Sequence, residues 1–387
     1  MDKHKMPVHH LRTLSAIARC RTAQLGGHID QCGSCGHLRI SYNSCRNRHC
    51  PKCQGINKEM WIIQQEDMLL PVVYYHVVFT LPHELNLLSM YNPRRMYDLL
   101  FESAWYTINT LANDPKWIGA NTAATMLLHT WSQQLSLHPH LHCIVPNGGL
   151  TPDGQWKFPN RSKNNFLMPV EAMVKMFKGY FMQQLMCKVK ANQVNIPNGY
   201  FNQFGGQTIW RRLLYKKAWN VFTKKPFSTS KHVINYLGRY SHRVAMTNRR
   251  IIAIDHNNVS FEYKDYRNKA QKKTMTLSGT EYLRRFCLHI LPPNYRKVRY
   301  FGFIANATKA KSISIARQAL KVKHHKLLNK QQRKQLALLR LFGTTDINQC
   351  PCCKKGRMEM IITINKNRPP PQHIITKIKN QNSQKPK

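Results

Sequence analysis

Hydrophobic positions follow two different periods along this chain of 387 residues, and the change of period outlines its elements. Residues 72–82 (VVYYHVVFTLP) are β-branched and aromatic and end at a proline, which predicts a buried strand. Two more short apolar runs predict strands over 123–131 (AATMLLHTW) and 140–146 (HLHCIVP), and an Asn-Gly-Gly turn follows the second of them.

Helical periodicity fills much of the chain between and around these strands. Apolar residues recur at helical spacing over 169–190, and we also expect helices over 56–70, 83–118 and 231–243. A hairpin is expected over 250–265, where two apolar runs flank a His-Asn-Asn turn. The order strand, helices, strand, strand, helix is typical of an antiparallel sheet with helices on one side, so the predicted fold class is α+β.

Composition divides the chain into four consecutive parts. Residues 1–55 are rich in Cys, His, Gly and Arg and predict a small metal-binding domain, and 56–305 contain the predicted sheet and its helices. Residues 306–360 form a basic C-terminal region in which 308–340 carry Lys and Arg but no Asp or Glu. The polar, basic tail 361–387 is expected to be disordered.

Charge narrows the class of partner. The chain has 60 Lys and Arg against 17 Asp and Glu, a formal net charge of +43, which attracts polyanions and favours nucleic acid. A membrane partner is not expected, because no apolar run approaches the roughly 20 residues of a spanning helix and no amphipathic anchor is evident. The N-terminal residues lack an apolar segment long enough for secretion, so a cytoplasmic, nucleoid-associated protein is expected.

Two Cys-x-x-Cys knuckles near the N-terminus predict a zinc site. Cys32 and Cys35 form the first knuckle, and Cys50 and Cys53 form the second, with 14 residues between them. Each knuckle offers two thiolates to one ion, and four thiolates complete the tetrahedron that structural Zn²⁺ prefers. This spacing beside histidines favours metal ligation over disulfides, which agrees with a reducing compartment.

Further ligand types lie close to the two knuckles. The spacing leaves open whether Cys45 replaces Cys50, and whether a second ion exists. Arg46 and Arg48 lie beside the expected metal, where they could contact phosphate. A second, interleaved zinc site could use four neighbouring side chains, namely Cys20, His28, Cys45 and His49.

A third knuckle lies near the other end of the chain. Cys350 and Cys353 have the spacing of a ligand pair, but no later cysteine exists and His373 is the only later histidine. The sequence therefore predicts only an incomplete zinc site at the C-terminal end.

The segment from His138 to Val145 contains the most informative pair of side chains. Alternate residues of a strand share a face, so His140 and His142 should project together while Leu141 turns to the core. Two imidazoles at this spacing can chelate one divalent ion, and imidazole by itself favours zinc or manganese over magnesium. A third ligand must fold in from elsewhere or be an amide: the nearest carboxylates are Asp114 and Asp153, the nearest amides are Gln133 and Gln134, and His138 lies in the same register.

Tyr236 and Tyr240 form a second informative pair. Their i, i+4 spacing places both on one face of a helix, one turn apart. Gly238 between them leaves room for a close approach of a backbone or a phosphate, and Arg239 and Arg243 add positive charge to the same turn. A phenol is a poor nucleophile at neutral pH, so a nearby cation or a metal-polarised phosphate would help it to react.

These features together resemble the HUH superfamily, in which two histidines flank a hydrophobic residue, here His140-Leu141-His142. The layout is similar to that of the two-tyrosine rolling-circle transposases of the insertion-sequence 91 type. The stretches that carry the resemblance lie within residues 20–300 and are CRTAQLGGHIDQCGSCG, NSCRNRHCPKCQ, HTWSQQLSLHPHLHCIVPNGG and INYLGRYSHRVAMTN.

The resemblance implies a fold and a chemistry. The fold is a ferredoxin-like palm, an antiparallel sheet with helices, preceded by a small zinc-binding domain, with 72–82 and 140–146 as its central strands. His140 and His142 would hold Mg²⁺ or Mn²⁺ against a phosphate of single-stranded DNA at the element ends and target. Tyr236 or Tyr240 would attack that phosphate, leaving a 5′-phosphotyrosine and a free 3′-hydroxyl, and the other tyrosine would serve a second cleavage or the strand transfer.

Two other functional interpretations share some of these features. A replication initiator or relaxase of the same superfamily would use the same chemistry in another biological process. A non-enzymatic zinc-dependent DNA-binding protein would explain the charge and the cysteines but not the histidine and tyrosine pairs. The oligomeric state and the recognised DNA sequences are not evident from the sequence.

Overall fold

The computed structural model describes residues 6–160, 168–224, 233, 238, 244–266, 268–322 and 327–383 of the chain. These residues form two compact units. The first unit combines Met1–Gln64 with Leu328–Lys387, and the second contains Gln65–Leu327. The parts expected at 306–360 and 361–387 are therefore not two separate regions, because Leu328–Lys387 folds with the beginning of the chain.

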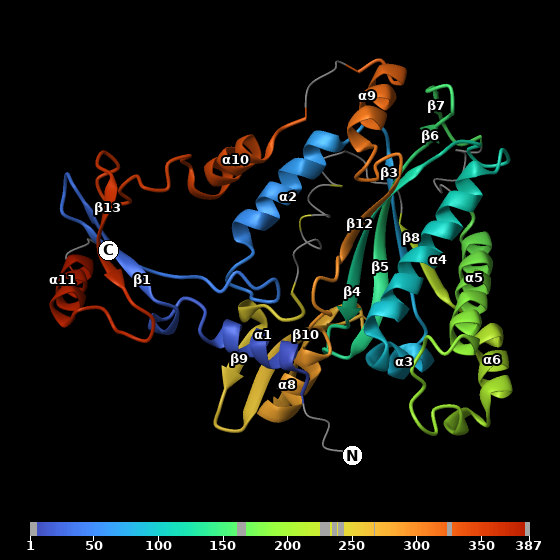
Figure 1. Cartoon of the computed structure of the whole chain (residues 1–387), viewed down its shortest axis with the longest axis horizontal. Coiled ribbons are helices and arrows are strands. Elements are labelled where there is room, and N and C mark those ends of the chain that lie inside the picture. Colours follow the sequence, from blue (N-terminus) through green and yellow to red (C-terminus); the bar gives the residue numbers. More distant parts are fainter. Residues whose placement is uncertain are drawn as a thin grey trace. The chain divides into compact units, whose positions relative to one another are not determined.

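The first unit is built on a three-stranded antiparallel sheet (Figure 1). Its strand order is β13-β1-β2, so the last strand of the chain pairs directly with the first. Ile29 and Leu38 pack with Ile364 and Ile374 in a small apolar core. The elements of this unit are α1 (Val8–Ala18), η1 (Ala23–Leu25), β1 (Gly27–Cys32), β2 (Leu38–Tyr42), α2 (Gly55–Met68), α10 (Lys330–Phe342), β13 (Met358–Ile364) and α11 (Gln372–Ser383), with the unit boundary inside α2.

The tail after residue 360 is ordered as far as Ser383, contrary to expectation. It contains the end of β13 and all of α11. Ile364 and Ile374 are buried there against Ile29. The composition of 361–387 is polar on average, but a few isoleucines spaced for burial are enough to dock a strand and a helix onto an existing sheet.

A five-stranded sheet forms the centre of the second unit. Its order is β12-β4-β5-β3-β8, and every neighbouring pair is antiparallel. The three strands predicted from apolar runs are confirmed, although β5 begins three residues earlier than expected and so includes His138. The strands are β3 (Tyr74–Thr80), β4 (Ala123–Trp131), β5 (Leu137–Pro146), β8 (Asn220–Lys224) and β12 (Val298–Gly302).

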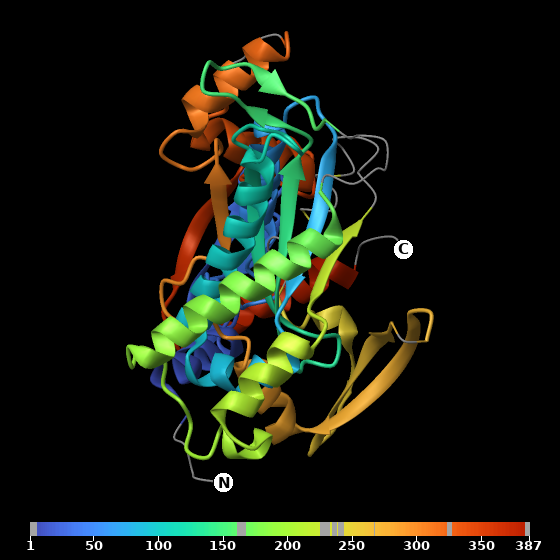
Figure 2. The same ribbon diagram turned by 90° about the vertical axis from the view of Figure 1, so that its right-hand side faces the viewer.

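Helices cover one face of this sheet. Figures 1 and 2 show α4 (Pro93–Asn113) and α5 (Val170–Lys190) lying across the same side of the strands. Phe79, Met126 and Leu141 project from three adjacent strands into the core that these helices close. The α5 helix begins one residue later than the expected range 169–190 and ends with it, and the predicted α+β class with an antiparallel sheet is confirmed. Two shorter helices, α3 (Asn86–Tyr91) and α6 (Gln207–Lys216), contribute to the same core, and η2 (His83–Leu85) and η4 (Asn202–Phe204) precede them.

A smaller three-stranded antiparallel sheet follows in the chain. The hairpin expected over 250–265 is confirmed as β9 (Ile251–Ile254) and β10 (Asn258–Asp265), preceded by η5 (Asn248–Arg250). The third strand, β11 (Gln271–Ser278), was not predicted because its sequence, QKKTMTLS, is largely polar and exposed. Phe261 of β10 is fully buried against Leu135 and Met246, and α8 (Gly279–Cys287) follows β11. The remaining elements are β6 (Gly149–Leu150), β7 (Trp156–Lys157) and α9 (Lys309–Ala319).

The helix expected over 231–243 lies outside the described residues, apart from Val233 and Gly238. Among the helices that the structure describes, none combines the length and the apolar composition needed to cross a membrane.

Candidate active site

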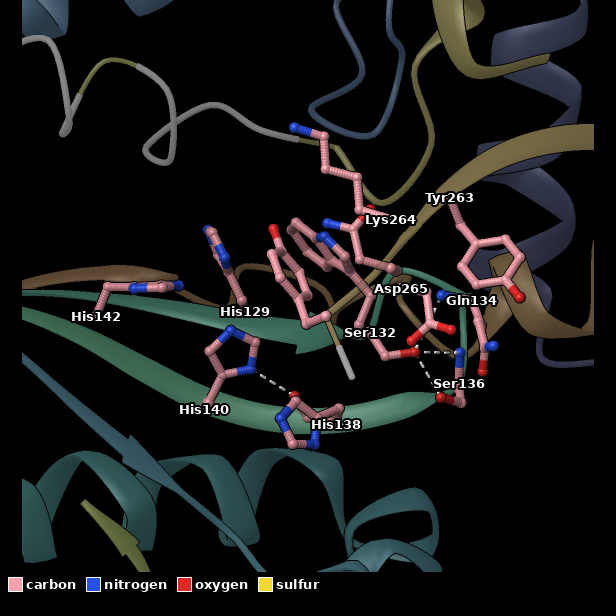
Figure 3. A pocket seen from close by; sticks show the side chains of 13 residues that line it. His129, Ser132, Gln134, Ser136, His138, His140, His142, Tyr263, Lys264 and Asp265 are labelled. Atoms are coloured by element: carbon pink, nitrogen blue, oxygen red, sulfur yellow. Dashed lines mark hydrogen bonds between the residues drawn. The ribbon is translucent and has the colours of Figure 1, made fainter. Parts of the chain in front are cut away.

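Three histidines meet on the sheet face opposite α4 and α5. His129 comes from β4, and His140 and His142 come from β5 (Figure 3). One ring nitrogen of each lies within 4.8 Å of one ring nitrogen of each of the others, a spacing that allows one ion to be shared. His129 and His142 are buried and His140 is half-buried, so the cluster is open on the side of His140.

Strand register explains why these side chains meet. Successive side chains of a strand point to opposite faces of the sheet, so Leu141 lies in the helix-covered core while His140 and His142 lie on the other face, as predicted. His129 is the direct cross-strand partner of His140, and residues directly opposite in an antiparallel pair point to the same face. His142 is two residues further along β5, so it lies diagonally from His129 on that face.

His129 is the member of this cluster that the sequence analysis did not identify. The segment 123–131 was recognised as a strand, and its histidine would have been found by pairing that strand with the one containing His140 and His142. The two amides proposed as third ligands, Gln133 and Gln134, line the same pocket as the three histidines. Their backbone carbonyls accept hydrogen bonds from Arg250 and Arg285. The carboxylates Asp114 and Asp153 are absent from the described lining of the pocket.

Hydrogen bonds fix the orientation of two of the three rings. Nδ1 of His140 lies 2.7 Å from the backbone oxygen of His138. A carbonyl can only accept, so this nitrogen carries the proton and Nε2 keeps its lone pair for a metal. Nδ1 of His142 lies 3.0 Å from Nε2 of His76, which is buried on β3. Since one ring must donate to the other, this contact restrains the tautomer of both.

The cluster lies at one side of an open, polar pocket of about 610 Å³. The end of β10 supplies Tyr263, Lys264 and Asp265 to its lining, and Tyr266 follows directly (Figure 3). The carboxylate of Asp265 is held by Nζ of Lys273 at 2.8 Å. This lining contains cationic, phenolic and hydroxyl groups that can contact a phosphate and its neighbouring nucleotides.

A buried histidine supports the connection between β4 and β5. Nε2 of His289 donates to the carbonyl of Leu135 over 3.1 Å, and its Nδ1 accepts from the hydroxyl of Thr130 over 3.2 Å. Burial lowers the pKa of His289 to about 4, so the ring is neutral near pH 7. Burial also lowers the pKa of His138, which lines the pocket.

The tyrosine pair cannot be placed against this cluster. Tyr236 and Tyr240, with Arg239 and Arg243 in the same predicted turn, lie outside the described residues. Their assignment stays a prediction.

The cysteines form two four-membered groups, and these differ from the predicted ones. Cys50 and Cys53 lie with Cys20 and Cys45, whereas Cys32 and Cys35 lie with the distant C-terminal knuckle, Cys350 and Cys353. In each group the sulfur atoms all lie within 4.8 Å of one another. The expectation that the two N-terminal knuckles share one ion is therefore wrong, and so is the view that the C-terminal knuckle has no partner pair.

The hairpin of β1 and β2 keeps the two N-terminal knuckles apart. Cys32 ends β1 and Cys35 lies in the turn that follows it, while Cys20 and Cys45 lie beyond the open end of the hairpin, where Gly27 pairs with Tyr42. Five residue steps at about 3.3 Å each separate the two ends of β1 by about 17 Å. Sequence spacing cannot reveal this separation, because 14 intervening residues are compatible with a short loop as well as with an extended strand.

The two histidines proposed for a second zinc site do not join either cysteine group. Nε2 of His28 faces Oδ1 of Asp30 at 3.4 Å. The backbone N–H of His49 donates to Oδ1 of Asn47, and its ring is in neither group. Only Cys20 and Cys45 of that predicted set come together, and they do so with Cys50 and Cys53.

The arginines beside the second knuckle lie in two environments. Arg46 is exposed and lines a hollow with Arg21, Lys52, Lys330 and Lys334. Arg48 is half-buried, and burial lowers its pKa. The first unit therefore presents a cluster of cationic side chains beside the group formed by Cys20, Cys45, Cys50 and Cys53.

Comparison with known proteins first defines the class of protein. Residues 1–81 match the family described as a transposase zinc-binding domain, and residues 123–312 match the family described as a putative transposase. The second match includes His129, His140 and His142. The chain is thus a transposase with an N-terminal zinc-binding domain.

Two curated relatives cover most of the chain. A protein named putative transposase y4qJ from Sinorhizobium fredii is 38% identical over 90% of this chain and 87% of its own length. The transposase for insertion sequence element IS801 from Pseudomonas savastanoi pv. phaseolicola is 30% identical over 81% of this chain and 74% of its own length. The chain belongs to the transposases of the insertion-sequence 91 type.

A solved structure shows a weaker likeness. The conjugative relaxase TrwC in complex with oriT DNA, in its metal-bound form, aligns with 44% of this chain and 71% of its own length at 10% identity. The TM-score of this alignment is 0.25, which does not establish a common fold.

Proposed function

We propose that this transposase nicks and rejoins single-stranded DNA through a covalent 5′-phosphotyrosine intermediate, in rolling-circle transposition. The observation that carries the proposal is the meeting of His129, His140 and His142 beside an open polar pocket. Three imidazoles on two paired strands are a ligand set for one divalent ion, and the pocket can admit a DNA backbone beside it. A ligand set that borders an open pocket favours a catalytic ion, because structural metal sites are closed by protein ligands.

The chain's own groups fit a divalent metal ion. Because Nδ1 of His140 carries the proton, Nε2 carries the lone pair that can bind a metal. His76 restrains the ring of His142, as outer hydrogen-bond partners do for metal-binding histidines. Mg²⁺ or Mn²⁺ at these three residues would polarise a phosphodiester as a Lewis acid. The all-imidazole donor set fits Mn²⁺ better than Mg²⁺, which prefers oxygen.

The nucleophile in this proposal is the phenol of Tyr236 or Tyr240. Its oxygen forms a bond to phosphorus, its proton passes to solvent or a basic side chain, and the bond to the 3′-oxygen breaks. A free 3′-hydroxyl then attacks the phosphotyrosine, which re-forms a phosphodiester and returns the phenol. The second tyrosine allows a second strand to be cleaved before the first is resolved.

The first unit is proposed to bind Zn²⁺ and DNA. Cys20, Cys45, Cys50 and Cys53 provide four thiolates within the residues that match the zinc-binding family, and this ligand set is typical of structural zinc. Arg46 and Arg48 lie between the ligands Cys45 and Cys50, so the metal would hold their backbone in place. Together with Arg239 and Arg243 beside the tyrosines, they are proposed to contact phosphates of the element ends and target.

The direct test is a covalent adduct. The purified protein is incubated with single-stranded DNA that carries its element end and with Mn²⁺ or Mg²⁺, and products are resolved on a denaturing gel. We expect a protein–DNA adduct that persists in each single variant, Tyr236→Phe or Tyr240→Phe, at reduced yield, and disappears in the double variant.

Two other tyrosines line the histidine pocket and provide matched controls. Tyr263→Phe and Tyr266→Phe each remove one hydroxyl near the cluster and should leave the adduct in place. Loss of the adduct in Tyr266→Phe, with retention in the double variant of Tyr236 and Tyr240, would assign the nucleophile to the pocket lining instead. If the element's own ends give no adduct with either metal, the phosphotyrosine mechanism is wrong.

A further inference from the structure

We propose that Cys32, Cys35, Cys350 and Cys353 bind a second structural Zn²⁺ ion, which fastens the C-terminal segment of the chain to its N-terminal zinc-binding domain. The proposal is independent of the nuclease chemistry. The site also lies partly outside the matched zinc-binding family, which ends at residue 81, so half of its ligands come from a part of the chain that this family does not include.

The sulfur positions fit a tetrahedral site. Sγ of Cys32 lies 3.7 Å from Sγ of Cys353, and Sγ of Cys35 lies 3.7 Å from Sγ of Cys350. Four sulfurs at about 2.3 Å from one Zn²⁺ ion are about 3.8 Å apart along each edge of a regular tetrahedron. A disulfide would need about 2.05 Å, and all four cysteines are free.

Backbone donors converge on the C-terminal sulfurs, as expected for thiolates. The N–H of Gly356 donates to Sγ of Cys353 over 3.3 Å, and the N–H of Cys352 donates to Sγ of Cys350 over 3.4 Å. These bonds favour the charged form that a metal requires. The turn also depends on glycine, since a Cβ at Gly356 would lie 2.5 Å from Sγ of Cys32.

The two halves of the site are held together by main-chain contacts as well. Cys32 of β1 pairs with Met358 of β13 at the end of the ladder next to the sulfurs. The N–H of Gly33 donates to the carbonyl of Arg357 over 3.2 Å. Met358 is buried against Cys32 and Cys350, so the environment of the site excludes water on one side.

This arrangement makes the first unit depend on both ends of the chain. Cys32 and Cys353 are separated by 321 positions, so their approach costs the entropy of closing a very long loop. Metal binding offsets that cost, because the free energy of binding to a site that exists only in the folded state stabilises the fold. The second metal site of the first unit can therefore form only after the ribosome has synthesised the chain as far as Cys353.

Zinc content of the full-length protein tests the site. We expect two Zn²⁺ ions per chain in the wild type by atomic emission, and one fewer in the double variant Cys350→Ser/Cys353→Ser. The matched control is Cys352→Ser, because Cys352 is exposed in the same knuckle and belongs to neither sulfur group, so its zinc content should equal that of the wild type. An unchanged zinc content in the double variant would overturn the proposal.

X-ray absorption of the wild-type protein at the zinc edge keeps the proposal testable if the double variant does not fold. Two four-thiolate sites predict a first shell of sulfur alone, at about 2.3 Å. A mixed shell of sulfur and nitrogen that persists when His129, His140 and His142 are all changed to alanine would mean that other histidines complete the second site, and it would overturn the assignment. A single zinc ion per chain in the wild type, with an all-sulfur shell, would also contradict it.

Discussion

At the scale of single residues, His129 is the proposed metal ligand whose removal tests the three-histidine cluster. His129→Ala leaves two imidazoles, and we expect the affinity for Mn²⁺ to fall by more than about 100-fold, since even outer-shell substitutions cost 10- to 100-fold. Paramagnetic resonance of free Mn²⁺ in a titration measures this affinity without any assay of activity.

His138 provides the control for that substitution. It lines the same pocket but lies outside the three-histidine cluster, and its contact with His140 uses the backbone oxygen that alanine retains. His138→Ala should therefore bind Mn²⁺ within a few-fold of the wild type. Equal losses in the two variants would mean that the ion is not held by the cluster.

A second residue-scale prediction concerns pH. Burial holds the pKa of His289 at about 4, below its ordinary value near 6.5. Below pH 6.5 the unfolded chain therefore binds a proton at this residue that the folded chain does not. The contribution of His289 to the free energy of unfolding is present above pH 6.5 and is lost as the pH falls towards 4. The loss attributable to this residue between pH 6.5 and 4.5 is about 2–3 kcal/mol in the free energy of unfolding.

The variant His289→Gln isolates that contribution. Glutamine keeps a donor for the carbonyl of Leu135 but does not titrate in this range. Urea unfolding at several pH values should give a shallower decline for the variant than for the wild type, and the difference between the two curves removes the effect of the other histidines. Parallel curves would show that His289 does not reject its proton in the fold.

At the scale of elements, two glycines should respond in opposite directions to alanine. Gly302 ends β12 with φ of +66°, and a Cβ there would lie 1.9 Å from the carbonyl oxygen of Thr122. Gly302→Ala should lower the free energy of unfolding by at least about 2 kcal/mol.

Gly179 lies inside α5 with nothing within 4 Å of the position that a Cβ would take, so Gly179→Ala should raise the free energy of unfolding by about 0.5–1 kcal/mol. Denaturant unfolding measures both, and a stabilised Gly302→Ala would contradict the described end of β12.

Elements with strong apolar patterns were predictable, and those that depend on distant partners were not. The strands β3 and β4 and the helix α5 match their expected ranges closely. Residues on both faces of the two strands are buried, and α5 has buried apolar residues at helical spacing, so each pattern is visible in the element's own sequence. By contrast, β11 and α11 are polar on average and are ordered by the neighbours they pair with or pack on. A period can indicate an element, but it carries no information about the surface on which that element docks.

The same distinction applies to the candidate sites. His140 and His142 were recognisable because both lie on one strand, whereas His129 became a partner only through the register between β4 and β5. The cysteine groups show the limit more plainly, since Cys32 and Cys353 meet only because β13 returns to β1. Local spacing identifies ligand pairs, and the pairing of pairs is a property of the tertiary fold.

At the scale of the whole molecule, the excess of 60 basic over 17 acidic residues predicts the salt dependence of DNA binding. Each phosphate of a single strand that a cation neutralises contributes a slope of about −0.7 to the logarithm of the binding constant against the logarithm of the salt concentration. Fluorescence anisotropy with labelled single-stranded DNA across a range of salt concentrations measures that slope. We expect it to be steeper than the slope that one or two neutralised phosphates would give.

The hollow beside the second knuckle should account for part of this slope. Arg46 and Lys334 both line it, so the double variant Arg46→Gln/Lys334→Gln should flatten the slope by about 1.4 if each neutralises one phosphate. Lys175 is exposed on α5 and lines neither this hollow nor the histidine pocket, so Lys175→Gln should leave the slope within error of the wild type. If Lys175→Gln flattens the slope as much per charge as the double variant does, the attraction comes from the summed charge of the molecule rather than from contacts at this surface.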